Sequence, residues 1–340
     1  MMKLAVLSFW HVHAKEYADQ AEQHPDTEIV AIWDEDPKRG EAEAAKRGAR
    51  FFANLDDLLA QPDIDGVIVT TPTTDHHDVI VRAARAGKHI FTEKVLAPTL
   101  AECNQILAAV AEAGVKLMVS LPRLNTGSTQ AIQEILAQGL LGQLTLVRVR
   151  LSHNGAIPSD GAASGWLPEH FYNLAQCGGG ALIDLGCHPM YLARLFAGLP
   201  ESVSANYGYV TDRQVEDNAV AILRYRNGAI GVVEAGFVNP HSPFSIEIHG
   251  THGSLFYGTP ENKLWVRSSM QRTSDANWVA LEQFPPDKPS AFEQWITHIQ
   301  RGTTAAENIE MAVDLTRLME ASNRSVMEHK PIYLSDLQNS

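Results

Sequence analysis

The first 120 residues alternate short apolar runs with helix-like segments, and this alternation limits the fold more than any other feature. Apolar runs joined by helical crossovers build a parallel sheet with helices on both faces. The runs are KLAVL (3–7), EIVAIW (28–33), RFFAN (50–54), DGVIVTTP (65–72), KHIFTEK (88–94) and KLMVS (116–120), and the best-marked helices are expected at 36–48, 76–86 and 98–113. The pattern predicts an α/β Rossmann domain, a doubly wound parallel sheet.

After Leu121 the pattern changes to that of an α+β domain with a mostly antiparallel, open sheet. Residues 145–152 alternate apolar and charged side chains, as in a strand with one wet face. Asn227-Gly228 and Thr251–Gly253 mark hairpin turns. Further helices are expected at 129–138, 178–198, 291–300 and 307–328. We therefore predict a cofactor domain at 1–121 and a substrate-binding and oligomerisation domain at 122–340, with the closing helix packed back on the first domain.

Charge and cysteine content exclude several classes of function. The 27 Lys and Arg against 40 Asp and Glu give a net charge of −13, which repels nucleic acid and anionic membranes and favours a small-molecule partner. The three cysteines have no metal-binding spacing and are typical of a reduced, cytoplasmic protein. No apolar run approaches the length of a membrane span.

The turn after the first strand reads LSFWHVHA and lacks the glycines of a dinucleotide fingerprint. Ser8, Trp10 and His13 stand at the glycine positions. A tryptophan side chain at the second position obstructs the approach of a diphosphate to the backbone, unless the loop is reshaped. The helix N-terminus still favours anions, and imidazoles can bind phosphate or ribose. The expected cofactor contacts in this loop are Ser8, Phe9, Trp10, His11 and Val12.

Asp34 ends the second strand about twenty residues past this turn. A carboxylate there accepts hydrogen bonds from the adenosine ribose and repels a 2′-phosphate, which favours NAD over NADP. Asp34 can also cap the following helix. Lys38 and Arg39 follow closely and can accommodate a phosphate.

Polar residues also follow the fourth and fifth strands, whose carboxyl ends face the ligand crevice of such a sheet. The further candidates for cofactor contact are Thr71, Pro72, His76, Glu93 and Lys94, with Thr70 beside them. An ammonium group in the crevice can donate to a substrate oxygen or stabilise a developing alkoxide. The alternatives are an ordinary proline turn at 70–77 and a surface ion pair between Lys94 and Glu93.

Asp184 and His188 lie four residues apart on the helix expected at 178–198, so their side chains should share one face. An imidazole beside a carboxylate is a suitable general base. Such pairs are also common as capping or surface contacts. A third metal ligand is not supplied by the spacing, and we predict no metal site.

Taken together, these motifs resemble the Gfo/Idh/MocA oxidoreductases, the glucose-fructose oxidoreductase and inositol dehydrogenase group. The resemblance covers nearly the whole chain and rests on TPTTDHH, AGKHIFTEK, GGGALIDLGCH, EDNAVAILRYRNGAIGVVEAG and IEIHGTHGSL. It implies that Lys94 polarises the reacting oxygen, that His188 moves the proton, and that Asp184 orients substrate or imidazole. It also implies a homodimer or homotetramer assembled through the second domain's sheet. Val95 departs from the family's E-K-P motif.

The sequence therefore predicts an NAD-dependent dehydrogenase or reductase acting on a secondary hydroxyl or ketone of a sugar, cyclitol or related polyol. The expected substrate contacts are Lys94, Arg123, Trp166, His170, Asp184 and His188; His153, Phe171 and Tyr172 lie on nearby segments. For Trp166 and Phe171, core packing is an equal alternative. Two other functions fit the motifs: an NAD-assisted enzyme that cleaves or eliminates a glycosidic substituent, and a non-catalytic sensor of sugar or cofactor.

Overall fold

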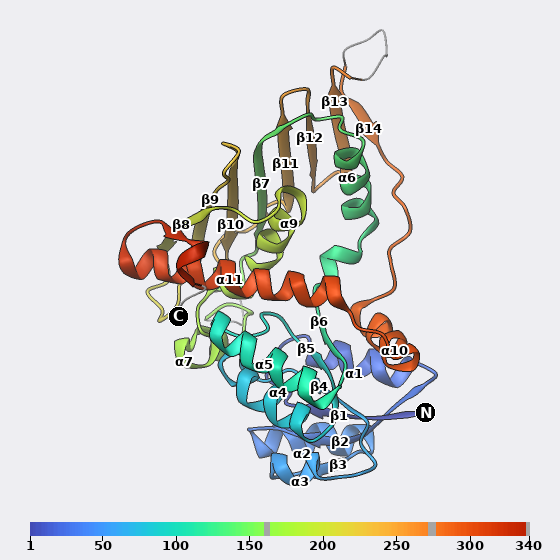
Figure 1. Cartoon of the computed structure of the whole chain (residues 1–340). Helices are drawn as coiled ribbons and strands as arrows, with labels where there is room; N and C mark the ends of the chain where they lie inside the picture. Colours follow the sequence, from blue (N-terminus) through green and yellow to red (C-terminus); the bar gives the residue numbers. More distant parts are fainter. Residues whose placement is uncertain (160–163, 271–276, 338–340) are drawn as a thin grey trace. The chain divides into compact units, whose positions relative to one another are not determined.

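The computed structural model describes residues 1–159, 164–270 and 277–337 (Figure 1). Contacts divide the chain into two compact units. The first comprises Met1–Leu121 and Pro289–Val313, and the second comprises Pro122–Lys288 and Asp314–Ser340. Residues 289–313 thus belong to the first unit, whereas the sequence interpretation assigned them to the second domain.

The first unit is built from six strands among the described residues, with helices between them. The strands are β1 (Met2–Leu7), β2 (Thr27–Trp33), β3 (Arg50–Phe52), β4 (Gly66–Val69), β5 (His89–Thr92) and β6 (Leu117–Val119). The helices are α1 (Ala14–Gln23), α2 (Pro37–Arg47), α3 (Leu55–Leu59), α4 (His76–Arg85), α5 (Leu100–Ala113) and α10 (Ala291–Arg301). All six predicted strands are confirmed, with ends that differ by a few residues.

The sheet of the first unit has the strand order β3-β2-β1-β4-β5-β6, and every pair is parallel. This is the order of a doubly wound dinucleotide-binding fold, and it confirms the predicted Rossmann domain. Leu4 to Leu7 of β1 are fully buried because helices cover both faces of the sheet. The loops that follow β1, β4 and β5 therefore lie at one edge of the sheet.

Helix α10 completes the core of this unit from far along the sequence. Its Phe292 and Trp295 rings lie 5.6 and 5.9 Å from the ring of Phe91 on β5. Ser290 and Glu293 form a capping box at its first turn, and Gly302 ends it in a left-handed conformation. The first domain thus needs residues that follow the second one in sequence.

The second unit contains a large sheet and several helices. Its strands within the described residues are β7 (Leu144–Ser152), β8 (Ser202–Gly208), β9 (Asn218–Arg224), β10 (Ile230–Gly236), β11 (Ser245–Gly250), β12 (Gly253–Gly258), β13 (Lys263–Ser268), β14 (Val279–Leu281) and β15 (Ile332–Tyr333). Its helices are α6 (Gly127–Ala137), α7 (Leu174–Cys177), α8 (Ala181–Asp184) and α9 (Cys187–Ala197). Helix α11 (Ala306–Glu328) begins in the first unit and continues in the second.

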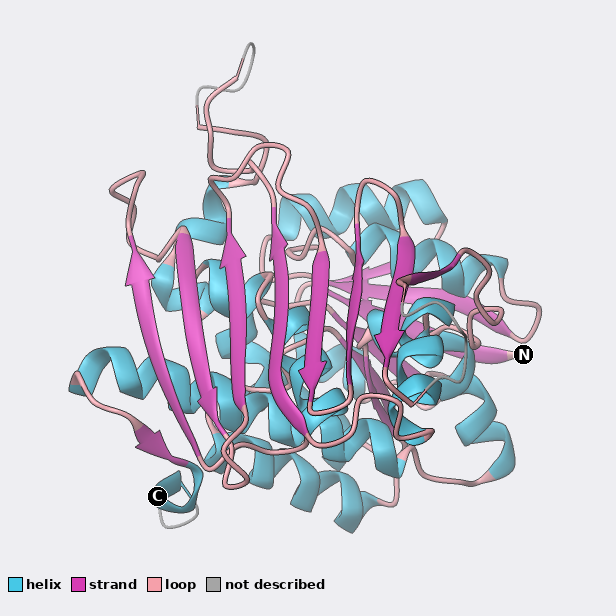
Figure 2. Cartoon of the chain, turned by 90° about the horizontal axis from the view of Figure 1, so that it is seen from above, coloured by secondary structure: helices cyan, strands magenta, loops and turns pink. Residues whose placement is uncertain are grey.

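The strands of this sheet lie side by side in the order β14-β13-β12-β11-β7-β10-β9-β8-β15 (Figure 2). β7 and β10 are parallel, and the other pairs are antiparallel, which confirms the predicted mostly antiparallel sheet. One face buries a row that includes Val149, Ala221 and Val233, against which α8 and α9 pack. The alternate positions, among them Arg148 and Phe256, remain partly exposed.

The single helix predicted at 178–198 is wrong, because the structure divides this segment into α8 and α9. The break falls at Leu185 and Gly186, where Gly186 donates from its amide to the carbonyl of Ala181. A Cβ on Gly186 would lie 2.7 Å from the carbonyl oxygen of Leu182 and 2.9 Å from Ala235 on β10. Glycine therefore permits close packing on the sheet, and Asp184 and His188 lie on two different helices.

Helix α11 is 23 residues long and carries acidic and basic residues along its length. None of the helices within the described residues is long and apolar enough to cross a membrane.

Candidate active site

The loop after β1 keeps its shape without glycine by hydrogen bonding to its own chain. Ser8 adopts the left-handed conformation (φ 79°) that the first fingerprint glycine would supply. Its hydroxyl oxygen accepts a hydrogen bond from the Trp10 amide at 3.0 Å, and its own amide donates to the Trp33 carbonyl at 2.7 Å. The His11 amide donates to the carbonyl of Thr70, at the end of β4, at 3.2 Å. These amides thus already have acceptors within the chain.

The side chains of the loop differ in their exposure. Ser8, Phe9, Trp10 and His11 are buried, whereas Val12 is 45% exposed. The indole of Trp10 is thus only 4% exposed. Of the five loop residues expected to contact a cofactor, only Val12 is largely exposed.

Asp34 is the residue to which this loop is attached. Its buried carboxylate accepts the Phe9 amide at 2.8 Å and the Asp36 amide at 2.8 Å. It also forms a bidentate pair with the guanidinium of Arg39, at 2.9 and 2.7 Å. Each carboxylate oxygen therefore accepts two hydrogen bonds, which fills the acceptor capacity that a ribose hydroxyl would use. Asp36, rather than Asp34, caps α2.

Buried polar atoms without hydrogen-bond partners gather at the ends of β4 and β5. Among the described residues, Thr71 Oγ1, His76 Nε2 and Glu93 Oε1 are such atoms. The other ring nitrogen of His76, Nδ1, lies 2.9 Å from the carbonyl of Val95, so Nδ1 carries the proton and Nε2 is an acceptor. Burial lowers the pKa of His76, which keeps the ring neutral. Pro72 starts the 3₁₀ turn that leads into α4.

Lys94 is buried, and its Nζ lies 3.7 Å from Glu93 Oε1. The ion pair considered from the sequence is therefore present, but it is buried, so its expected place at the surface is wrong. Burial raises the pKa of Glu93, but His11, His13 and Lys94 outweigh this effect and hold it well below its usual range. Glu93 is therefore a carboxylate. The Lys94–Val95 peptide bond is cis.

The ends of β4 and β5 present buried polar atoms that a bound ligand can satisfy. Buried acceptors and hydroxyls without partners are rare in folded proteins, and a bound ligand is one way to satisfy them. In the loop after β1, the amides of Ser8, Phe9, Trp10 and His11 already donate to acceptors within the chain. A diphosphate there would be bound by the remaining amides, by side chains or by the N-terminus of α1.

In the second unit, the imidazole of His188 is held by Tyr191. The Tyr191 hydroxyl lies 2.9 Å from Nδ1 of His188, and it accepts the Arg123 amide at 3.1 Å. Both His188 and Tyr191 are buried. The contact at Nδ1 fixes the orientation of the imidazole ring. The sequence analysis missed Tyr191, although its position three residues after His188 places it on the same face of α9.

Asp184 is the last residue of α8, and the segment that carries it is anchored by Glu216. The Glu216 carboxylate accepts from the amides of Gly180 and Leu182 at 2.8 and 2.9 Å, and the Ala181 amide donates to its carbonyl. A Cβ on Gly180 would collide with the Glu216 backbone. The glycine run and the EDNAV motif therefore form one packed unit, which the sequence alone did not reveal.

The other predicted substrate residues of this unit have mixed surroundings. Trp166 is 54% exposed, so core packing is wrong for it, whereas Phe171 is buried. His153 stacks on Phe237, and burial lowers its pKa although Asp184 acts in the opposite direction. The guanidinium of Arg123 lies over the Phe244 ring, and His170 is partly exposed. Tyr172 is buried, with the guanidinium of Arg213 over its ring.

Two family models match this chain. Residues 10–121 match the model of the oxidoreductase family with an NAD-binding Rossmann fold, and residues 129–256 match that of the GFO/IDH/MocA C-terminal domain. An uncharacterised oxidoreductase of Rhizobium meliloti is 30% identical over 69% of this chain and 68% of its own. The chain belongs to the Gfo/Idh/MocA family of oxidoreductases. The predicted family and its NAD-binding Rossmann domain are thus confirmed.

Relatives of known name fall within sugar and cyclitol chemistry. The 1,5-anhydro-D-fructose reductase of Ensifer adhaerens is 28% identical over 71% of this chain and 72% of its own. The inositol 2-dehydrogenase of Rhizobium meliloti (strain 1021) is 26% identical over 95% and 96%. A levoglucosan dehydrogenase solved with NADH and L-sorbose shares the fold, with a TM-score of 0.82 and 19% identity over 99% of this chain and all of its own.

Arg39 is predicted to control the choice between NAD and NADP. The Arg39→Ala variant frees the Asp34 oxygens for a ribose hydroxyl and removes the cation that a 2′-phosphate needs. Loss of a charge-assisted hydrogen bond costs about 1.5–3 kcal/mol, so the ratio of NADH to NADPH affinity should rise by at least about tenfold. Titrations of both nucleotides measure this ratio. Lys46→Ala, at an exposed position in the last turn of the same helix, should leave the ratio nearly unchanged. Equal ratios in the wild type and Arg39→Ala would contradict the assignment.

Glu216 should make the stability of the second unit depend on pH. Burial raises the pKa of Glu216 to about 7, so the folded protein retains a proton that the unfolded chain loses near pH 4.5. This stabilisation is complete below that pH and is lost as the pH rises through about 7. The difference in unfolding free energy between wild type and Glu216→Gln should therefore fall by roughly 3 kcal/mol between pH 5 and pH 8.

Urea unfolding at several pH values measures this difference. Glu169→Gln, at an exposed position of the same unit, is the control and should run parallel to the wild type. A constant difference between wild type and Glu216→Gln across this range would refute the assignment.

Proposed function

We propose that the chain transfers a hydride between nicotinamide and a secondary hydroxyl or ketone carbon of a sugar, cyclitol or related polyol. Family membership supports the reaction class, and relatives named as a sugar reductase and an inositol dehydrogenase support the substrate class. The observation that carries the proposal is the buried Lys94 at the end of β5, a cation held at the crevice edge of a dinucleotide fold.

The proposed roles follow from the surroundings of each residue. A bound nicotinamide would supply the redox chemistry, as acceptor of the substrate's hydride in oxidation. Lys94 donates a hydrogen bond to the reacting oxygen and stabilises negative charge on it. His188 accepts the hydroxyl proton at Nε2 while Tyr191 fixes the ring at Nδ1. Reduction of a ketone reverses these transfers.

The remaining residues are proposed to position the reactants. Asp184 orients substrate or imidazole, and Arg123, Trp166 and His170 contact the hydroxyl groups or ring of the sugar. Thr71, His76 and Glu93 offer polar atoms for the cofactor at the strand ends. The remaining candidates for contact with the cofactor are Val12, Pro72 and Asp34. For Asp34, this contact depends on whether Arg39 is paired with its carboxylate.

Variants of the catalytic pair test this function. Lys94→Ala and His188→Ala should each lower kcat/KM for a polyol identified by screening by about 100-fold or more, the range for loss of one stabilising donor or one general base. NADH binding by His188→Ala should remain within a few-fold of the wild type. Absorbance of NADH follows turnover, and wild-type rates in both variants would contradict the assignment.

A sensor that binds cofactor or sugar without turnover is the second candidate. The self-bonded loop after β1 favours it, because four of its amides, those of Ser8, Phe9, Trp10 and His11, already have acceptors within the chain. One experiment, with deuterated NADH and a panel of ketoses and inososes, distinguishes the enzyme from the sensor. Deuterium in the product indicates the enzyme, whereas saturable binding with no transfer to any of them indicates the sensor.

We also propose a homodimer or homotetramer formed through the open face of the second unit's sheet. The row across this face pairs Glu247 with both Arg148 and Phe256, and Phe256 with Trp265. Phe256 is 39% exposed, and Arg148 forms ion pairs with Glu234 and Glu247 at 2.7 and 3.5 Å. Apolar rings among paired charges are typical of an assembly surface.

A charge placed in this row should separate the subunits. Phe256→Lys introduces a desolvated cation if the row is an interface, and the mass measured by light scattering should fall to that of one chain. Val210→Lys, at an exposed loop position of the same unit, is the matched control and should keep the wild-type mass. A monomeric wild type, or an assembly unaffected by Phe256→Lys, would contradict the proposed interface.

A further inference from the structure

Tyr17 of α1 is a buried tyrosine of the first unit, and its hydroxyl contacts the residue before Lys94. The hydroxyl donates a hydrogen bond to Glu93 Oε2 and lies 2.8 Å from the hydroxyl of Ser120, which follows β6. The phenol ring packs edge-on against Phe91 of β5, with ring centres 5.1 Å apart. Burial and the Glu93 carboxylate raise the pKa of Tyr17 well above its usual value, so the phenol keeps the proton that it donates.

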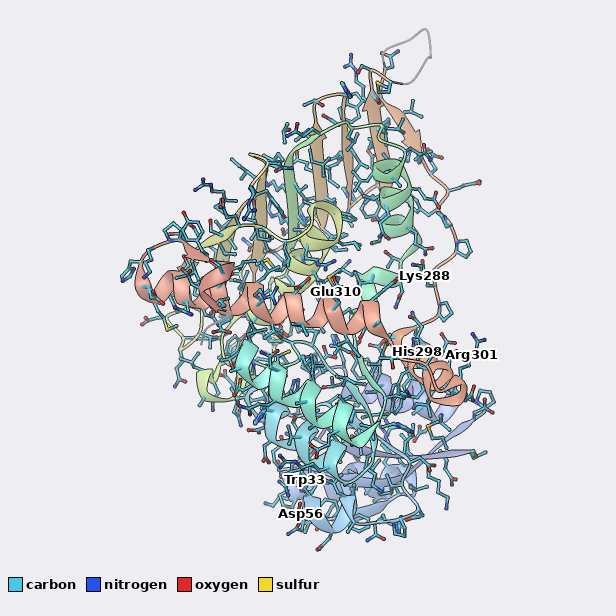
Figure 3. All side chains as sticks on the ribbon, in the orientation of Figure 1. Trp33, Asp56, Lys288, His298, Arg301 and Glu310 are labelled. Carbon is cyan, nitrogen blue, oxygen red and sulfur yellow. The ribbon has the colours of Figure 1, made fainter. Side chains whose placement is uncertain are left out.

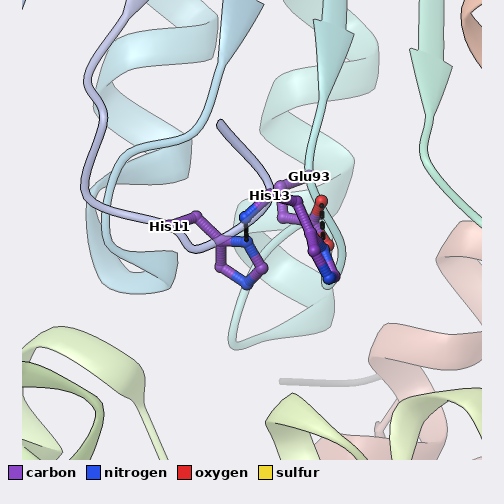
Figure 4. Close-up of side chains that lie close together, drawn as sticks. All are labelled: His11, His13 and Glu93. Carbon is purple, nitrogen blue, oxygen red and sulfur yellow. Dashed lines mark hydrogen bonds and ion pairs between the residues drawn. The ribbon is translucent and has the colours of Figure 1, made fainter. Parts of the chain in front are cut away.

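The two oxygens of the Glu93 carboxylate face different partners. Oε2 accepts from Tyr17 and lies 3.6 Å from Nδ1 of His13 (Figure 4). Oε1 lies 3.7 Å from Nζ of Lys94 and interacts with this ammonium as an opposite charge. Glu93 thus connects a hydroxyl on α1 to the cation at the end of β5.

Oε1 stays opposite Lys94 only if the carboxylate of Glu93 does not turn. The terminal torsion of a glutamate side chain has broad preferences, so a contact from outside has to fix it. The side chain of His13 is 38% exposed, whereas Tyr17 is 5% exposed and is itself held by Phe91 and Ser120. A side chain that packing has locked in place is a suitable support for a functional group. Tyr17 is therefore the rigid contact that sets the rotation of this carboxylate.

We propose that Tyr17 is a positioning residue for Lys94: it fixes the Glu93 carboxylate so that Oε1 holds the ammonium towards the reacting oxygen. This inference rests on the proposed function, in which Lys94 stabilises charge on that oxygen. A misplacement of about 1 Å lowers a rate by roughly 100-fold, so the orientation of Lys94 affects turnover. Tyr17 precedes Glu93 by 76 residues, and no local motif in the sequence connects them.

Tyr17→Phe removes the hydroxyl and keeps the ring that packs on Phe91. Without this donor the Glu93 carboxylate is free to turn, and Lys94 loses the fixed charge opposite its ammonium. Loss of a charge-assisted hydrogen bond corresponds to about 10- to 100-fold in rate. With a polyol identified by screening, kcat should therefore fall by about tenfold or more, while KM stays within a few-fold of the wild type.

A double-mutant cycle separates positioning from a general structural role. If Tyr17 acts through Lys94, Tyr17→Phe should cause no further loss of kcat once Lys94→Ala is present. A structural role would lower kcat by the same factor in both backgrounds, and that result would overturn the proposal.

Two matched variants serve as controls. Tyr225→Phe is the same substitution at a buried tyrosine whose hydroxyl has no hydrogen-bond partner among the described residues. His298→Phe removes the contact between His298, on α10 of the same unit, and the hydroxyl of Thr303, 2.8 Å away (Figure 3). Both controls should keep the wild-type kcat. A loss in either one as large as that in Tyr17→Phe would contradict the assignment.

A measurement without turnover keeps this proposal separate from the proposed function. NMR of the full chain labelled with ¹³C at the lysine ε-carbons reports the surroundings of each ammonium, and the Lys94 signal is assigned by its loss in Lys94→Arg. This signal should move in Tyr17→Phe towards its position in Glu93→Gln, and it should stay in place in both controls. Ser120→Ala, which removes the other contact of the phenol hydroxyl, should move it in the same direction by a smaller amount.

Circular dichroism establishes that each variant is folded. A Lys94 signal that does not move in a folded Tyr17→Phe, or in Ser120→Ala if Tyr17→Phe does not fold, would overturn the positioning role. The predicted shift together with no turnover by the wild type would refute the proposed reaction and leave the contact between Tyr17, Glu93 and Lys94 supported.

Discussion

The carboxylate of Asp34 holds the cofactor-binding edge of the first unit together. It is buried and accepts the Phe9 and Asp36 amides and both donors of Arg39. A buried carboxylate is costly unless hydrogen bonds and an opposite charge compensate it, and here both are present. Through these bonds the end of β2 fixes the loop after β1 and leads into α2. The His11 amide in turn links this loop to the carbonyl of Thr70 at the end of β4.

The loop shows how a dinucleotide fold persists without its glycines. Ser8 takes the left-handed conformation that costs a non-glycine residue about 1–2 kcal/mol, and its hydroxyl offsets part of this cost by accepting the Trp10 amide. As a result the amides of Phe9, Trp10 and His11 serve the fold. Buried polar atoms without hydrogen-bond partners lie instead at the ends of β4 and β5, on Thr71, His76 and Glu93.

Much of the fold could be predicted from the sequence, because apolar periodicity and glycine or proline signals are local. The strands of the first sheet and the hairpin at Asn227-Gly228 are such cases. The break between α8 and α9 could not be predicted, since it depends on the contact of Gly186 with β10. The same limit applies to the short edge strands β14 and β15 and to the return of α10 to the first unit, where Trp295 packs on Phe91.

For the same reason, only part of the candidate site could be predicted from the sequence. Residue types and motifs identified Lys94, Asp184 and His188, but not the side chains that hold them. Tyr191 and Glu216 became evident only in the structure, because their partners are set by packing. The sequence placed Asp34 at the ribose position, yet it could not show that Arg39 already fills both carboxylate oxygens.

The account rests on the claim that this glycine-free fold still binds a nicotinamide dinucleotide. Calorimetric titration of the purified full chain with NADH, after removal of any cofactor that co-purifies, tests this most directly. The account predicts saturable binding with one NADH per chain. A complete absence of binding for NADH and for NADPH would contradict it.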